Sequence, residues 1–187
     1  MIELELQTKR LYLRTPHKKM LRVIVSFNNR NKDRFKVWEG ELGKDYFTEM
    51  YQKRLIKAER KSQHRSDSLC FYIFEEMTNF LVGKISVYSI AFGNASNAVL
   101  GYKLDKDVEG RGYMKEALER VIEFMFDEVN LHRLEINLLE RNVRSKNLAE
   151  SLGFTLEGES KEFMEINGQW EDHLRYVLIN KRWKKYD

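Results

Sequence analysis

The chain has 187 residues, of which 33 are Lys or Arg and 29 are Asp or Glu, so its formal net charge is +4. This length fits one domain, residues 1–187, that buries a sizeable core without covalent staples. The 11 Phe, 9 Tyr and 3 Trp residues exclude a largely disordered chain, and the single cysteine, Cys70, excludes an intrachain disulfide framework. An acidic start and short apolar runs predict neither export nor a membrane span, so we expect a reducing, cytoplasmic compartment.

The first half of the chain alternates helical and strand-like patterns. A polar stretch over residues 61–68 predicts a loop, and Pro16 ends the first strand. In chain order the apolar spacing predicts a strand, two helices and three strands, at 4–14, 20–27, 44–60, 69–74, 81–88 and 98–104.

The second half contains the clearest helix. Apolar residues keep the i, i+3, i+4, i+7 spacing from Met114 to Val129. A strand is predicted at 133–139, and a short helix at 145–152 ends at Gly153, a residue suited to a left-handed cap. Strands beginning at 154 and covering 176–179 follow, with a hairpin turn at Asn167-Gly168.

Two glycines mark the turn between the strand at 98–104 and the long helix, where residues 109–114 read Glu-Gly-Arg-Gly-Tyr-Met. Such a turn points backbone N–H groups outward at the positive end of the helix dipole, which favours phosphate. A tight turn that requires positive φ explains the glycines equally well. The Gly-Lys-Ser/Thr ending of a Walker loop and the first glycine of the dinucleotide fingerprint are both missing, which disfavours nucleotide hydrolysis and dinucleotide binding.

This loop resembles the acyl-CoA pyrophosphate loop of the GNAT N-acetyltransferases, usually written Gln/Arg-x-x-Gly-x-Gly/Ala. In their order, further segments resemble the ribosomal-protein-alanine (RimJ/RimL) branch of that superfamily: 7–14, 131–135, 142–145, 152–154, 156–158, 167–170 and 172–173. The resemblance covers nearly the whole chain and implies the GNAT fold, an α/β (α+β) architecture. That fold has a central mixed, mostly antiparallel twisted sheet, helices on both faces and a splayed pair of central strands.

The resemblance also implies acetyl-CoA as cosubstrate, with its pantetheine arm paired to exposed backbone of the strand at 98–104. The residues that it implies for cofactor binding are Tyr102, Lys103, Leu104, Glu109, Gly110, Arg111, Gly112, Tyr113, Met114, Lys115, Asn142 and Ser145. Glu109 and Met114 depart from the family pattern, which has Gln or Arg and Gly or Ala at these positions. Because a carboxylate beside a pyrophosphate is unfavourable, we expect Glu109 to face the protein or to cap the helix. Asn142 either holds the pantetheine arm or caps a helix.

Two catalytic residues are predicted, Ser145 and Glu135. Ser145 matches a serine near the CoA sulfur in this branch, although it could serve only as a helix cap. The tyrosine found seven residues after the asparagine in many GNAT enzymes is Ala149 here, so Ser145 or a water assists the departing thiolate. The base stays open among Glu135, Glu75 and a hairpin carboxylate, since a histidine such as His132 at a strand start is more often structural. The four histidines are too scattered for a metal site.

Direct attack requires a neutral amine, and this requirement bears on the acceptor. A lysine amine costs about 3.5 kcal/mol more to deprotonate than an α-amine, which favours a protein N-terminus such as that of a ribosomal protein.

Six acids against one base, Lys161, over residues 157–172 form either an acidic mouth for a cationic acceptor or a solvated hairpin face. Cys70 lies in an apolar strand and is expected to be a core thiol, not a nucleophile.

The alternatives are a small-molecule amine acetyltransferase acting on a polyamine or aminoglycoside, a non-catalytic acyl-CoA sensor and a basic nucleic-acid-binding domain. Acids are interleaved with the basic residues almost everywhere, so no direct nucleic-acid contact is expected. The sequence is also compatible with a homodimer.

Overall fold

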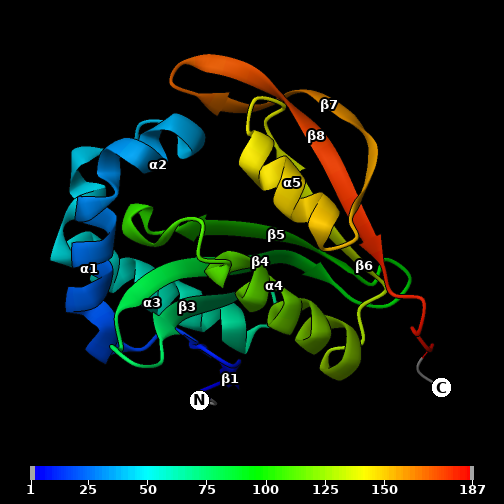
Figure 1. Ribbon diagram of the computed structural model, residues 1–187, viewed down its shortest axis with the longest axis horizontal. Helices are drawn as coiled ribbons and strands as arrows, with labels where there is room; N and C mark the ends of the chain where they lie inside the picture. The colour runs from blue at the N-terminus through cyan, green and yellow to red at the C-terminus, as the bar shows by residue number, and fades with distance from the viewer. Residues whose placement is uncertain (1–2, 186–187) are drawn as a thin grey trace.

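The computed structural model describes residues 3–185 as one eight-stranded sheet flanked by helices (Figure 1). The strands are β1 (Glu5–Gln7), β2 (Leu11–Arg14), β3 (Leu69–Glu75), β4 (Leu81–Ala91), β5 (Asn97–Leu104), β6 (Arg133–Leu138), β7 (Thr155–Ile166) and β8 (Gln169–Ile179). The helices are α1 (Leu21–Arg30), α2 (Lys32–Glu39), α3 (Glu49–His64), α4 (Tyr113–Glu123) and α5 (Val143–Ser151). Shorter turns are η1 (Lys18–Met20), η2 (Lys44–Phe47), η3 (Lys106–Val108) and the π-helical η4 (Phe124–Glu128).

The strand order is β1-β2-β3-β4-β5-β6-β8-β7, and every neighbouring pair is antiparallel except β5 and β6. These two parallel strands pair only where Asn97, Ala98 and Val99 meet Arg133, Leu134 and Glu135, and beyond that point they diverge. The predicted fold class, a mixed and mostly antiparallel sheet with a splayed central pair, is confirmed.

Helices cover both faces of the sheet, as predicted. Fully buried Ala117, Leu118 and Val121 of α4 pack against the core that the sheet presents on one face, and Figure 1 shows α4 and α5 on that side. On the other face, residues of α1, α2 and α3 such as Phe27 pack with Tyr72 and Phe74 of β3. The alternation of side chains along each strand places these two cores on opposite sides of one sheet.

The predicted single strand over residues 4–14 is wrong, because the chain turns back at Thr8–Arg10 to form the β1–β2 pair. The backbone amide of Thr8 donates to the Leu11 carbonyl at 2.9 Å, and the Thr8 hydroxyl accepts from the Leu11 amide at 3.0 Å. A threonine that bonds to nearby backbone can make such a turn without glycine or proline, so the usual turn signal is missing.

The helices differ from the prediction in three further places. Helix α2 has no counterpart in the sequence pattern because Phe35 is its only buried residue. Helix α3 continues to His64, into the segment predicted as a loop. The long helix ends at Glu123 and continues as the wider turn η4, in which Phe124, Met125 and Phe126 are all buried, whereas the prediction extended a regular helix to Val129.

The hairpin turn at Asn167-Gly168 is present, but β8 begins at Gln169, so the last strand is much longer than the predicted 176–179. Strand β8 lies inside the sheet, and β7 is the edge strand. Among the described residues, no helix is both long and apolar enough to cross a bilayer.

Candidate active site

The divergence of β5 and β6 leaves backbone groups of β5 without a strand partner. The Asp105 amide donates to the Val82 carbonyl of β4 at 2.7 Å. Because successive residues of a strand direct their peptide groups to opposite edges, those of Tyr102 and Leu104 face the open side. Lys103 differs from the prediction in that its peptide group faces β4, while its ammonium group bonds Glu39 of α2 at 2.9 Å.

The loop before α4 presents unpaired backbone amides. Gly110 and Gly112 have φ angles of +76° and +77°, a conformation that favours glycine. Within residues 3–185, the amides of Gly110, Arg111 and Gly112 donate to no other group. They adjoin the first turn of α4, whose own amides lack helical partners. Loop and helix together therefore offer a cluster of donors suited to a diphosphate.

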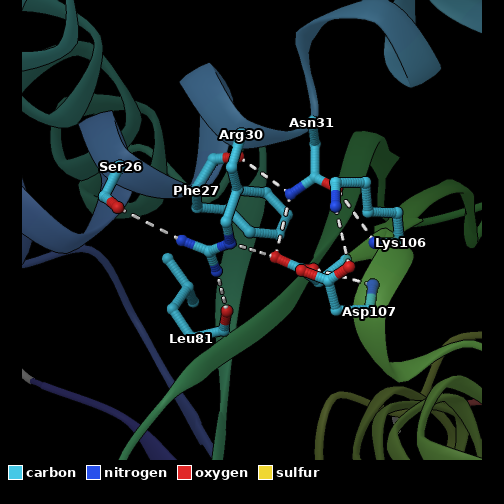
Figure 2. Close-up of polar contacts among 8 residues, drawn as sticks. Ser26, Phe27, Arg30, Asn31, Leu81, Lys106 and Asp107 are labelled. Carbon is cyan, nitrogen blue, oxygen red and sulfur yellow. Dashed lines mark hydrogen bonds and ion pairs between the residues drawn. The ribbon is translucent and has the colours of Figure 1, made fainter.

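Helix α1 anchors the start of this loop through Asp105, whose side chain is fully buried. Arg30 Nε and Asn31 Nδ2 donate to the Asp105 carboxylate, the latter at 2.9 Å, and the Asp107 amide donates to it at 3.0 Å. Arg30 also donates to the Leu81 carbonyl at 2.6 Å. Figure 2 shows Arg30 and Asn31 reaching from α1 toward the segment that contains Asp107. These bonds fix the end of β5 to α1.

The β1–β2 turn braces the first turn of α4 through Glu116. The Glu116 carboxylate accepts from the Thr8 hydroxyl at 2.6 Å, from the Arg10 amide at 2.9 Å and from Arg10 Nε at 2.7 Å. Burial acts to raise the pKa of Glu116, but these bonds outweigh it and the pKa is lowered. Arg10 also donates to the Arg111 carbonyl at 3.0 Å, which ties this turn to the loop itself.

Glu109 lies between two guanidinium groups. Its carboxylate forms ion pairs with Arg34 of α2 and Arg144 of α5. The expectation that Glu109 faces the protein agrees with this geometry. Neither arginine was given a role from the sequence, because arginines are spread along the whole chain and no local pattern singles these two out.

Ser145 of α5 and Tyr102 of β5 form a hydrogen bond that joins these two elements. The Ser145 and Tyr102 hydroxyl oxygens lie 2.6 Å apart, and burial raises the pKa of Tyr102 while the bond with Ser145 acts to lower it. The Asn142 side chain accepts from the Ser145 amide at 3.2 Å, so Asn142 caps α5. The sequence singled out Tyr102 for its backbone alone; its hydroxyl is a group that the prediction missed.

The two glutamates considered as bases lie on opposite faces of the sheet. Glu75 is on the α4 side, where the Thr78 hydroxyl, at 2.6 Å, and the Tyr113 hydroxyl donate to it and lower its pKa. Glu135 is on the other side, at the point where β5 and β6 separate, and accepts from Arg133 at 2.8 Å. Of the two, only Glu135 therefore lies beside the point where β5 and β6 separate.

Cys70 and His132 have the structural roles that the sequence predicts for them. Cys70 is buried, its thiol donates to the Ser86 hydroxyl at 3.7 Å, and burial raises its pKa. The His132 ring packs edge-on against Trp183 with 5.5 Å between ring centroids.

The acidic hairpin is partly neutralised by its own neighbours. Arg133 binds both oxygens of Glu157 at 2.7 and 2.6 Å, and Lys161 bonds Glu159 and Asp172 at 2.8 Å each. These pairs favour a solvated hairpin face over an acidic mouth. The hairpin tip also reaches α2, and a cleft of about 470 Å³ between them is lined by Lys36, Glu39, Gly40, Glu41, Glu165, Asn167 and Gly168.

Comparison with known proteins identifies the family. Residues 10–155 match the model of the acetyltransferase (GNAT) domain. A probable N-acetyltransferase of Bacillus subtilis (strain 168) is 32% identical over 83% of this chain and 86% of its own length. The ribosomal protein uS5-alanine N-acetyltransferase of Escherichia coli (strain K12) is 27% identical over 97% of this chain and 93% of its own.

Among solved structures, the ribosomal-protein-S5-alanine acetyltransferase of Vibrio fischeri superposes with a TM-score of 0.92 at 27% identity, covering 97% of this chain and 100% of that one. The family match spans well over half the sequence, and the structural match covers nearly the whole chain. The chain therefore belongs to the GNAT family and is an N-acetyltransferase whose cosubstrate is acetyl-CoA.

Proposed function

We propose that this chain acetylates the N-terminal α-amine of a protein, in the manner of the ribosomal-protein-alanine enzymes. The observation that carries this proposal is similarity over nearly the full length to uS5-alanine N-acetyltransferases, which includes the strands β5 and β6. The ion pairs of the hairpin weaken its attraction for a polycation such as a polyamine, compared with an unpaired acidic face.

The cofactor would lie along the groups described above. The amides of Gly110 to Gly112 and the α4 dipole would hold the diphosphate. The pantetheine arm would add to the open edge of β5 at Tyr102 and Leu104, as an extended peptide adds to a sheet. With the cofactor bound in this way, its thioester would lie where β5 and β6 diverge, beside the first turn of α5.

Acetyl transfer would then proceed by direct attack. A neutral amine adds to the thioester carbonyl, the C–S bond breaks and CoA leaves as a thiolate, while the ammonium formed on the acceptor nitrogen gives its proton to solvent water beside Glu135. Ser145 would donate a hydrogen bond to the departing sulfur, and the Tyr102 hydroxyl at 2.6 Å would hold the serine in place. An α-amine has a pKa of about 7.7–8.0, so much of it is neutral near pH 7.5 without a strong base.

Acceptor class is tested by following CoA thiol release with three substrates. These are a peptide with a free N-terminal alanine and an internal lysine, the same peptide with its N-terminus acetylated, and spermidine. We expect turnover of the first alone. Equal turnover of the blocked peptide, or preference for spermidine, would refute the proposal, and acetyl-CoA binding without any turnover would indicate a sensor.

The leaving-group role is tested with Ser145→Ala and Tyr102→Phe. Losing a hydrogen bond to a charged group costs about 1.5–3 kcal/mol, so S145A should lower kcat by roughly 10- to 150-fold with little change in KM for acetyl-CoA. Y102F should lower kcat by a smaller factor. Cys70→Ala is the control and should retain wild-type kcat; an S145A enzyme with unchanged kcat would assign this role to water.

A further inference from the structure

Three charged residues from three separate elements converge at the start of the loop that precedes α4. Glu109 begins the glycine loop, Arg34 lies on α2 and Arg144 lies in the first turn of α5. Both guanidinium groups pair with the one carboxylate. The Arg144 side chain is 76% exposed and the Glu109 side chain 24% exposed, so this contact lies at the surface and can open to solvent.

The position of this carboxylate is unfavourable for a diphosphate. Glu109 directly precedes Gly110, whose amide belongs to the proposed donor cluster, and like charges at close range repel. Arginine, in contrast, matches phosphate oxygens with paired N–H donors. Arg34 and Arg144, which are well suited to bind phosphate, are thus held by Glu109, whose negative charge would repel it.

We propose that Glu109 is an internal substitute for the cofactor's diphosphate: it holds Arg34 and Arg144 in the free enzyme, and acyl-CoA displaces it from both. This inference rests on the proposed use of the loop as the diphosphate site. It adds two binding residues, Arg34 from α2 and Arg144 from α5. It also makes cofactor binding an exchange of ion pairs, in which α2 and α5 both come to contact the ligand.

Calorimetric titration of CoA into Glu109→Gln, Arg144→Gln and the double variant tests the exchange. Glutamine is one of the two residues in the family pattern at this position, and it removes only the charge. E109Q should bind CoA about 5- to 30-fold more tightly, since two half-exposed ion pairs, each worth up to about fivefold, no longer compete. R144Q should weaken binding less than threefold in the wild type but at least fivefold in the E109Q background, where Arg144 is free for the phosphate.

Glu123→Gln is the matched control, because it makes the same charge change at an ion pair with Arg120 at the far end of α4. It should leave CoA affinity unchanged, and thermal melts establish that each variant is folded. Dephospho-CoA, which keeps the diphosphate, should show the same gain in E109Q, whereas pantetheine, which has no phosphate, should show none.

The opposite outcomes overturn the proposal. Weaker CoA binding by E109Q would mean that Glu109 positions the arginines for the ligand. Equal effects of R144Q in both backgrounds would mean that no exchange occurs, and a gain confined to CoA would assign the contact to the 3′-phosphate. If the wild type binds CoA and E109Q binds it with the same affinity, this inference alone is refuted. If the wild type does not bind CoA, the proposed function is refuted as well.

Discussion

Asp105 is expected to be the most sensitive polar residue of the cofactor loop. Its fully buried carboxylate accepts from Arg30, from Asn31 at 2.9 Å and from the Asp107 amide at 3.0 Å. In Asp105→Asn the charge is lost, and the new amide group faces donors where an acceptor is required. Removing one partner of a buried ion pair costs about 3–5 kcal/mol.

The lower end of that range applies here. The Arg30 side chain is 22% exposed and keeps its 2.6 Å bond to the Leu81 carbonyl, so its charge is not left wholly without partners. A loss of about 3 kcal/mol is a large share of a typical 5–15 kcal/mol stability. With an m-value of about 2–3 kcal/mol per molar, the urea midpoint should fall by about 1–1.5 M.

Urea unfolding followed by tryptophan fluorescence measures this shift. Asp107→Asn is the control, because it makes the same change two residues away at an exposed pair with Lys106, where the expected loss is below about 1 kcal/mol. If D105N and D107N unfold at the same urea concentration, the buried network does not anchor the loop, and the reasoning fails.

Two further predictions concern the same region. Gly112→Ala should lower the melting temperature by several degrees because φ is +77° there, although the nearest atom, Arg10 Nη2, leaves 3.5 Å for the new methyl group; Gly158→Ala, which meets no atom within 4 Å, is the control and should change it little. Glu116 has a lowered pKa, so its charged form stabilises the fold fully above its ordinary value of 4.5 and this contribution disappears as pH falls through the lower folded value. The stability gap between wild type and Glu116→Gln should accordingly be present at pH 7 and shrink as the pH falls below 4.5, and a gap independent of pH would refute the assignment.

Local patterns in the sequence predicted those parts of the fold that depend on near neighbours. The helical spacing after Met114 predicts α4, and Asn167-Gly168 predicts the hairpin turn, because each signal lies within a few residues. The glycine pair at 110 and 112 likewise indicates the loop, since positive φ is a local requirement. The turn at Thr8 is also local, but its polar side chain gives a weak signal.

By itself, then, the sequence determined the family, the cofactor loop and most of the element order. Only the tertiary structure decided which side chains complete the site. The Tyr102 and Ser145 hydroxyls are 43 positions apart in the chain, and Arg30 and Asp105 are 75 apart. Contacts at such separations depend on strand order and on which face each residue occupies, so no local pattern records that Arg34, Glu109 and Arg144 meet.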